Sequence, residues 1–121
     1  MSRILVVDDE SSVRRLLIQF LQSQGHETLE AEGGDQALAM AAEARPDLVL
    51  LDIDMPGRDG LATLRRLRLQ SPDLPVVMVS GIQDEPRALQ ALEDGACDFV
   101  RKPFDLKRLR EVVLHQLALA A

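Results

Sequence analysis

Short runs of branched aliphatic residues alternate along the chain with longer segments in which apolar residues recur every three or four positions. The clearest short runs are residues 4–7, 48–51, 76–79 and 99–101. Uninterrupted Val, Ile and Leu are typical of strands buried on both faces, as in parallel sheets. A weaker strand is predicted at residues 27–31, where polar and apolar residues alternate as they do at a sheet edge. This alternation of strands and helices predicts an α/β fold, (βα)₅, with a doubly wound five-stranded parallel sheet.

The longer segments predict five helices. The first begins after Asp9 and ends at Gly25, a residue type that tolerates positive φ. The others are expected at about 34–44, 58–69, 84–94 and 106–117, with Asp105 as the N-cap of the last. The inward positions expected of the first, third and fifth helices are Val13, Leu16, Leu17, Phe20, Leu21, Leu61, Leu64, Leu67, Leu109, Val112, Val113 and Leu117.

Length and composition limit the classes of protein to consider. The chain has 121 residues, so we expect one domain over residues 1–121, and its net charge of −6 argues against direct binding of nucleic acid. No apolar run approaches about 20 residues and no signal peptide is recognisable, so we expect no membrane contact and a cytoplasmic location. The single cysteine, Cys97, excludes an internal disulfide and is expected to be buried and unreactive.

The strand-like runs stop at polar residues of reactive kinds. Asp8 and Asp9 follow the first run, Asp52 follows residues 48–51, Ser80 follows residues 76–79, and Lys102 follows the last. In an open parallel sheet, ligands bind outside the carboxyl ends of the strands. We therefore expect these side chains to converge on one rim, where they would suit a divalent metal ion and a phosphoryl group.

Three carboxylates at adjacent strand ends need compensation. Each like-charged pair about 4 Å apart costs roughly 4 kcal/mol at an effective dielectric constant near 20. Three such pairs are large beside net stabilities of about 5–15 kcal/mol, so either some of the carboxylates are protonated or a cation lies among them. Mg²⁺, a hard ion with oxygen ligands, is the simplest candidate. The ordinary alternative makes Asp9 a helix N-cap and Asp8 a turn residue.

Lys102 and Ser80 complete the expected rim. A lysine facing the acidic cluster can neutralise a carboxylate and contact phosphoryl oxygens, although a lone lysine is usually a solvated surface charge. Ser80 could donate a hydrogen bond to the same group, although serine at a strand end is usually a turn residue. The chain must turn immediately after Lys102 to bring it into the rim, so we expect its peptide bond with Pro103 to be cis.

These segments resemble the signature of response-regulator receiver domains, the phospho-acceptor domains of two-component signal transduction. The similar segments read VDDE at 7–10, LDIDMPGRDG at 51–60, VSG at 79–81 and VRKPF at 100–104. The resemblance covers the whole chain and implies a flavodoxin-like sheet of strand order 2-1-3-4-5. The edge-like pattern of residues 27–31 agrees with this order.

The resemblance also implies a role for each rim residue. Asp52 would be the phospho-acceptor, and Mg²⁺ would be held by Asp8, Asp9, Asp52 and the backbone carbonyl of Asp54. Lys102 would contact the phosphoryl group, and Ser80 and Phe99 would form the switch. The implied partners are a sensor histidine kinase or phosphotransfer protein, a C-terminal output domain in a longer protein, and a second copy on phosphorylation. The switched surface would be that of the fourth helix, fifth strand and fifth helix.

The sequence departs from the commonest family pattern at four positions. Phe99 replaces the frequent tyrosine, Gly81 stands where alanine is common, Asp54 is an acid two residues after the acceptor, and Ile82 is apolar two residues after Ser80. None of these changes removes an essential part. Ile82 is expected near the phosphoryl group, where it would shield the acyl phosphate from water.

Two other function classes share parts of this pattern. The pair Asp52 and Asp54 also fits the DxD motif of haloacid-dehalogenase-type phosphatases, but that motif follows the first strand of a longer chain with a cap. A flavodoxin-like cofactor binder would need a phosphate-binding loop after the first strand, where this chain has acids. We therefore expect a signalling domain that assists its own phosphoryl transfer, not an enzyme.

Overall fold

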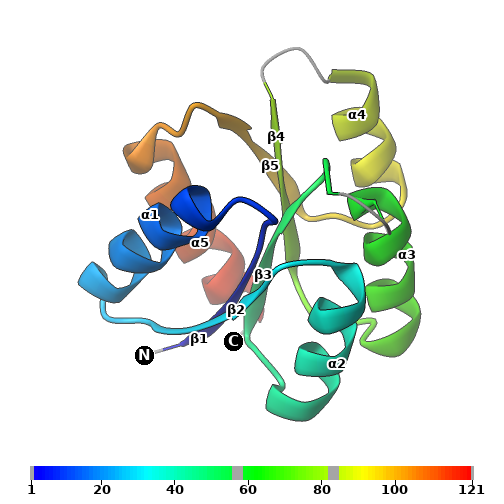
Figure 1. Ribbon diagram of the computed structural model, residues 1–121, viewed down its shortest axis with the longest axis horizontal. Coiled ribbons are helices and arrows are strands. Elements are labelled where there is room, and N and C mark those ends of the chain that lie inside the picture. The colour runs from blue at the N-terminus through cyan, green and yellow to red at the C-terminus, as the bar shows by residue number, and fades with distance from the viewer. Residues whose placement is uncertain (1, 56–58, 82–84, 121) are drawn as a thin grey trace.

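The computed structural model describes residues 2–55, 59–81 and 85–120, which form alternating strands and helices (Figure 1). The strands are β1 (Arg3–Val7), β2 (Glu27–Ala31), β3 (Leu48–Asp52), β4 (Val76–Gly81) and β5 (Asp98–Lys102). The helices are α1 (Ser11–Ser23), α2 (Gly34–Ala44), α3 (Gly60–Gln70), α4 (Glu85–Glu93) and α5 (Leu106–Ala120). All ten elements expected from the sequence are present, and α5 extends three residues beyond its expected end at 117.

The five strands form one parallel sheet in the order β2-β1-β3-β4-β5, which confirms the expected topology. Helices α1 and α5 cover one face, and α2, α3 and α4 cover the other (Figure 1). Successive strand residues point to opposite faces and therefore enter two separate cores. Leu5, Val7 and Val49 pack on one side, whereas Ile4 and Val6 pack on the other. Both faces of the central strands are buried, which accounts for their uninterrupted apolar runs.

Helix ends follow the expected local chemistry. Gly25 and Gly95, at the ends of α1 and α4, have φ angles of 89° and 108°, which favour glycine. Asp105 accepts a hydrogen bond from the backbone N–H of Lys107 (3.0 Å) at the start of α5. Asp59 does the same for α3, accepting from Ala62 at 2.8 Å. The two aspartate caps fix where α3 and α5 begin at the carboxyl ends of the strands, whereas the two glycines end α1 and α4 before the next strand starts.

Two expectations about side-chain burial were wrong. Leu16 is 45% exposed, because α1 turns Arg14, Leu17 and Leu21 toward the sheet in its place. Cys97 is exposed as well. Its backbone N–H binds the carbonyl of Val76 at the entry to β5, where Ala96 is the residue that faces inward. Within the described residues, no helix is long and apolar enough to cross a membrane.

Candidate functional site

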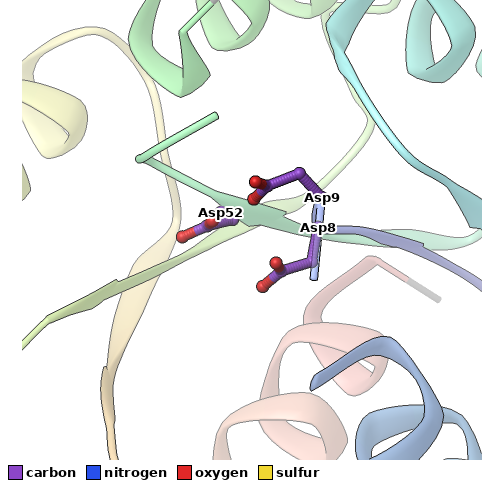
Figure 2. Close-up of side chains that lie close together, drawn as sticks. All are labelled: Asp8, Asp9 and Asp52. Atoms are coloured by element: carbon purple, nitrogen blue, oxygen red, sulfur yellow. The ribbon is translucent and has the colours of Figure 1, made fainter. Parts of the chain in front are cut away.

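Three aspartates meet at the carboxyl ends of β1 and β3. These strands are neighbours, and Val7 pairs with Leu51, so Asp8 and Asp52 occupy corresponding positions just beyond that pair. The carboxyl groups of Asp8, Asp9 and Asp52 gather at one point (Figure 2), and each offers an oxygen within 4.8 Å of the other two. Asp8 and Asp52 are only 1% and 3% exposed, whereas Asp9 lies open to solvent. The cluster is therefore buried at Asp8 and Asp52 and open to solvent at Asp9.

Lys102 contributes the positive charge of this cluster. Its Nζ lies 3.1 Å from Asp8 Oδ2 and 3.4 Å from Asp52 Oδ1. It comes from β5, whose last residue pairs with Gly81 of β4, so its side chain reaches across the end of β4 to the two aspartates. The peptide bond to Pro103 is cis. Among the residues that the structure describes, one ammonium thus faces three carboxylates, which leaves an excess of negative charge.

The environment raises the pKa of Asp52 to about 6. Burial is the main cause and the neighbouring charge of Asp8 adds to it, whereas Lys102 offsets part of the shift. Burial lowers the pKa of Lys102, but the hydrogen bond to Asp8 and the charge of Asp52 outweigh burial, and the net shift is upward. Lys102 is therefore protonated at neutral pH, and Asp52 is an anion whose charge is poorly solvated by the protein alone.

Asp8 is held from several sides. Its Oδ1 accepts a hydrogen bond from the backbone N–H of Glu10 (2.9 Å), and its own backbone N–H donates to the carbonyl of Ala31 (3.2 Å). Asp8 is therefore a turn residue, as the ordinary interpretation has it, and its Oδ2 accepts a hydrogen bond from Lys102. The N-cap of α1 is Glu10 rather than Asp9, with no capping hydrogen bond from its side chain. Asp9 is thus not used as a helix cap.

The side chain of Asp54 contacts α4. Its carboxylate forms an ion pair with the guanidinium of Arg87 from α4, whose Nη2 also lies 3.2 Å from the carbonyl of Ile53. The backbone N–H of Asp54 acts on Asp52 and lowers its pKa slightly against the larger effect of burial. Asp54 therefore takes part in the site through its backbone, while its side chain faces α4.

Ser80 and Phe99 lie on the two strands beyond β3. Ser80 is buried in β4, one residue beyond Val79, the residue that pairs with Asp52. Phe99 is half-buried in β5 and packs against the core on the side of α2, α3 and α4, with the guanidinium of Arg101 5.4 Å from its ring centroid. The structure thus places Ser80 next to the end of β3, whereas Phe99 packs against one of the two cores. Ile82 lies outside the described residues.

Sequence reasoning missed three residues that shape the site. Arg14 is buried beneath Asp8 and donates to its backbone carbonyl, and Arg87 pairs with Asp54. Gly60, the first residue of α3, donates its N–H to the carbonyl of Ile53 at 2.8 Å, and a Cβ there would lie 2.5 Å from Ile53 Cα. The apolar periodicity carries no signal for either arginine, since both are placed by tertiary contacts. Gly60 could have been found as the glycine that opens a helix directly after the acidic segment.

Comparison with known proteins agrees with this geometry. The family model described as response regulator receiver domain matches residues 4–114. The chain is 42% identical over 118 residues to the regulatory protein AtoC of Escherichia coli K12, covering 98% of this chain and 26% of AtoC. It is 35% identical over 117 residues to sporulation initiation phosphotransferase F of Bacillus subtilis, covering 97% of this chain and 94% of that protein.

A solved structure gives the same result in three dimensions. The receiver domain of NtrX from Brucella abortus superposes with a TM-score of 0.92 at 45% identity, over 95% of this chain and 98% of that one. Several relatives are much longer than this chain, which spans 48% of the transcriptional regulatory protein ResD of Bacillus subtilis, to which it is 42% identical over 118 residues, or 98% of this chain. The similarity to AtoC and ResD is thus confined to one part of each.

Proposed function

The chain belongs to the response regulator receiver domain family, the signalling domains of two-component systems, and from this premise we propose that Asp52 accepts a phosphoryl group in a Mg²⁺-dependent reaction. The donor would be a sensor histidine kinase or a phosphotransfer protein. One observation carries this proposal: Asp52 is buried at a strand end, with two other carboxylates within 4.8 Å and the Lys102 ammonium at 3.4 Å. We further propose that residues 1–121 form a single receiver domain.

The donor set fits Mg²⁺. Asp8, Asp9 and Asp52 offer only oxygen atoms, and together with the backbone carbonyl of Asp54 they would hold the ion on the open side of the cluster. When bound, the ion would offset the negative charge of the carboxylates and of the phosphoryl oxygens. The raised pKa of Asp52 supports this assignment, because burial and the neighbouring charge of Asp8 disfavour the ionised carboxylate, which a bound cation would favour.

The chemistry at the protein's own atoms is a phosphoryl transfer. A carboxylate oxygen of Asp52 attacks the phosphorus in line, so that its P–O bond forms while the bond from phosphorus to the donor nitrogen or oxygen breaks. The donor's leaving group departs on the opposite side with the bonding electron pair. Lys102 would contact a phosphoryl oxygen, and the Ser80 hydroxyl would donate to another. The residues contribute mainly by position and charge, and the chain performs no catalytic turnover on a separate substrate.

The acyl phosphate would act on the rest of the molecule through Ser80 and Phe99. It would bias an existing two-state equilibrium and change the surface formed by α4, β5 and α5. That surface would contact a partner protein, a second copy of this chain, or an output domain in a longer protein. Relatives such as AtoC and ResD are longer than the part of them that this chain matches. A cytoplasmic location remains a prediction from the sequence.

The phosphatase alternative is weakened by the direction of the Asp54 side chain. A general acid at this position would have to face the leaving group beside Asp52, whereas the Asp54 carboxylate is paired with Arg87 on α4. The motif also follows β3, the third strand of the chain, rather than the first.

Labelling with a small-molecule phosphodonor tests the proposal. The wild-type protein should incorporate one phosphoryl group with Mg²⁺ and none with a chelator, and Asp52→Asn should abolish the label. Asp73→Asn is the matched control, since this exposed aspartate lies in the segment between α3 and β4. The modified residue is identified by peptide mass spectrometry. Undiminished labelling of Asp52→Asn, with the phosphate on another residue, would overturn the assignment.

A further inference from the structure

Arg14 is a buried arginine directly behind the acidic cluster. It is 8% exposed, although arginine is among the residues least often buried without partners. It lies on the inward face of α1 together with Leu17 and Leu21, whereas Leu16 lies outside that face. Burying a guanidinium on an otherwise apolar helix face needs compensation from specific partners.

Those partners belong to two different parts of the chain. Nη1 donates to the backbone carbonyl of Asp8 at 2.8 Å, and this hydrogen bond is buried. Nε donates to Glu30 Oε1 at 3.1 Å, and Nη2 lies 3.5 Å from Glu32 Oε1. The planar guanidinium presents its donors in a fixed fork, so contacts on two of its edges fix the distance between the partners. Arg14 therefore ties the segment after β1 to the end of β2.

This tie completes the set of contacts that hold Asp8. The Asp8 N–H is bound by Ala31, its Oδ1 by Glu10, its Oδ2 by Lys102, and its carbonyl by Arg14. Of these four contacts, the one to the carbonyl is made by a charged side chain to the backbone, and it is buried. If it is lost, the peptide plane after Asp8 can rotate, and the carboxylates of Asp8 and Asp9 lose their common orientation.

We propose that Arg14 is a positioning residue for the metal and phosphoryl chemistry at Asp8, Asp9 and Asp52. It acts through the backbone of Asp8 and touches neither the ion nor the phosphoryl group. This inference rests on the proposed function, because it concerns the same site. Residues that orient metal ligands typically change metal affinity or activity by about 10- to 100-fold when they are mutated.

If Arg14 acted only through its charge, the effect of its loss on Mg²⁺ affinity would be the opposite. Arg14 is a cation near a site for a cation, so loss of its charge alone would tighten Mg²⁺ binding. Glu30 and Glu32, with side chains 58% and 75% exposed, already oppose its charge from the other side. Arg14→Lys keeps the charge but loses the fork, and Arg14→Gln loses both. Positioning predicts weaker Mg²⁺ binding in both variants, whereas electrostatics predicts little change in the first and tighter binding in the second.

The experiment measures Mg²⁺ affinity by calorimetry for wild type, Arg14→Lys, Arg14→Gln and Arg15→Gln. Arg15 is the matched control, because it is the next residue of α1 and is exposed. We expect about 10- to 100-fold weaker binding in both Arg14 variants and wild-type affinity in Arg15→Gln. Labelling of Asp52 should shift to higher Mg²⁺ concentration and largely recover at saturation. Wild-type affinity in Arg14→Lys, or tighter binding in Arg14→Gln, would overturn the proposal.

A second readout needs no metal. In the metal-free protein, the amide proton of Glu10, which binds Asp8 Oδ1, should exchange at least several-fold faster in the Arg14 variants while protection in β3 and β4 is unchanged. Unchanged exchange at Glu10 would count against positioning. If neither Arg14 variant folds, the double variant Glu30→Gln with Glu32→Gln removes the anchor and leaves Arg14 in place. This double variant should bind Mg²⁺ several-fold more weakly than wild type. Wild-type affinity would show that the contacts of Arg14 with Glu30 and Glu32 do not position Asp8.

The two proposals can fail separately. If the wild-type protein neither binds Mg²⁺ nor is labelled at Asp52, the proposed function is wrong, and amide exchange at Glu10 still reports whether Arg14 orders Asp8. If the wild type binds and is labelled while the Arg14 variants match it, only the positioning role is wrong.

Discussion

Arg87 of α4 holds the carboxylate of Asp54, two residues after the proposed phospho-acceptor, in an ion pair. The pair joins the helix of the proposed switch surface to the segment that leaves β3, and Arg87 Nη2 reinforces it by donating to the carbonyl of Ile53. The Asp54 side chain is 64% exposed, so its charge acts through solvent on an anionic phosphodonor near Asp52. Arg87 therefore offsets the negative charge that Asp54 adds near Asp52.

The first prediction concerns this charge. Arg87→Gln should slow labelling by an anionic small-molecule phosphodonor by about two- to fivefold, the range expected for loss of an exposed ion pair. The physical reason is that Asp54 then repels the donor without compensation. Adding Asp54→Asn to Arg87→Gln should restore the wild-type rate. The measurement is the initial labelling rate at saturating Mg²⁺.

Ionic strength separates this effect from a structural one. An electrostatic barrier at an exposed site should shrink as salt rises from 0.01 to 1 M, because the Debye length falls from about 30 Å to 3 Å. A slow rate that persists at high salt, or a double variant no faster than Arg87→Gln, would show that the arginine acts by holding α4 in place.

The second prediction concerns the close approach of α3 to the acceptor strand. A Cβ on Gly60 would lie 2.5 Å from Ile53 Cα and 2.9 Å from its carbonyl oxygen, and closer still to the carbonyl oxygen of Asp52. Gly60→Ala should therefore lower the free energy of unfolding by about 1–3 kcal/mol, as overpacking does, despite the better helix propensity of alanine. Gly33→Ala, where a Cβ meets nothing within 4 Å, is the control for urea unfolding. Equal stability of the two variants would contradict this account.

Much of this site could be predicted because it depends on strand ends. Parallel strands bring their carboxyl ends to one rim, so reading the residues that follow each apolar run was enough to assemble Asp8, Asp52 and Lys102. The two arginines could not be found in this way. Arg14 reaches Glu30, 16 residues away, and Arg87 reaches Asp54, 33 residues away, so each depends on how the elements pack. Periodicity instead favoured Leu16 as an inward residue, since it registers apolar side chains and not a satisfied buried cation.

The third prediction separates metal binding from phosphoryl transfer at Lys102. Its ammonium lies 3.1 Å from Asp8 and 3.4 Å from Asp52, so it competes with a divalent ion for the same carboxylates. Lys102→Ala should tighten Mg²⁺ binding by about three- to tenfold. It should also slow labelling by about 100-fold, because a charge that would contact the phosphoryl oxygens is lost. Lys107→Ala, the chain's other lysine, on α5, is the control.

Calorimetry with Mg²⁺ and labelling rates at saturating Mg²⁺ check the two halves independently. Weaker metal binding in Lys102→Ala would mean that the lysine orders the aspartates rather than competing for them. A labelling rate within threefold of wild type would remove Lys102 from the phosphoryl-transfer step.

The fourth prediction concerns the remote surface. Attachment of a stable phosphoryl mimic at Asp52 should change amide exchange in α4, β5 and α5 more than in α1 or α2. Ser80 lies on β4, between the strand of Asp52 and β5, and Phe99 lies on β5 itself. Ser80→Ala should reduce the change in α4 and β5 while leaving the mimic bound. Hydrogen exchange with mass spectrometry makes the measurement, with Asp52→Asn as the unmodified control. Changes confined to the strand ends would argue against a relay.

The last prediction follows from the raised pKa of Asp52. Its pKa is about 6 in the folded protein against an ordinary value of 3.8, so folding disfavours the charged form. The protein therefore has its full stability from this group below about pH 4 and loses it as the pH rises through about 6. The loss at neutral pH is about 3 kcal/mol at most in the metal-free protein. Asp52→Asn, which cannot ionise, should escape this penalty.

Urea unfolding in the presence of a chelator checks this at two pH values. At pH 7.5, Asp52→Asn should be more stable than wild type by about 1–3 kcal/mol, since the lost contact with Lys102 offsets part of the gain. At pH 4.5 the difference should shrink by about 2 kcal/mol, because the wild-type carboxyl is then largely protonated in the folded state. Saturating Mg²⁺ at pH 7.5 should stabilise wild type more than the variant, since Asp52 is a proposed ligand. A stability difference that is independent of pH would mean that the Asp52 carboxylate is not destabilised by burial, and the case for a bound cation would then rest on geometry alone.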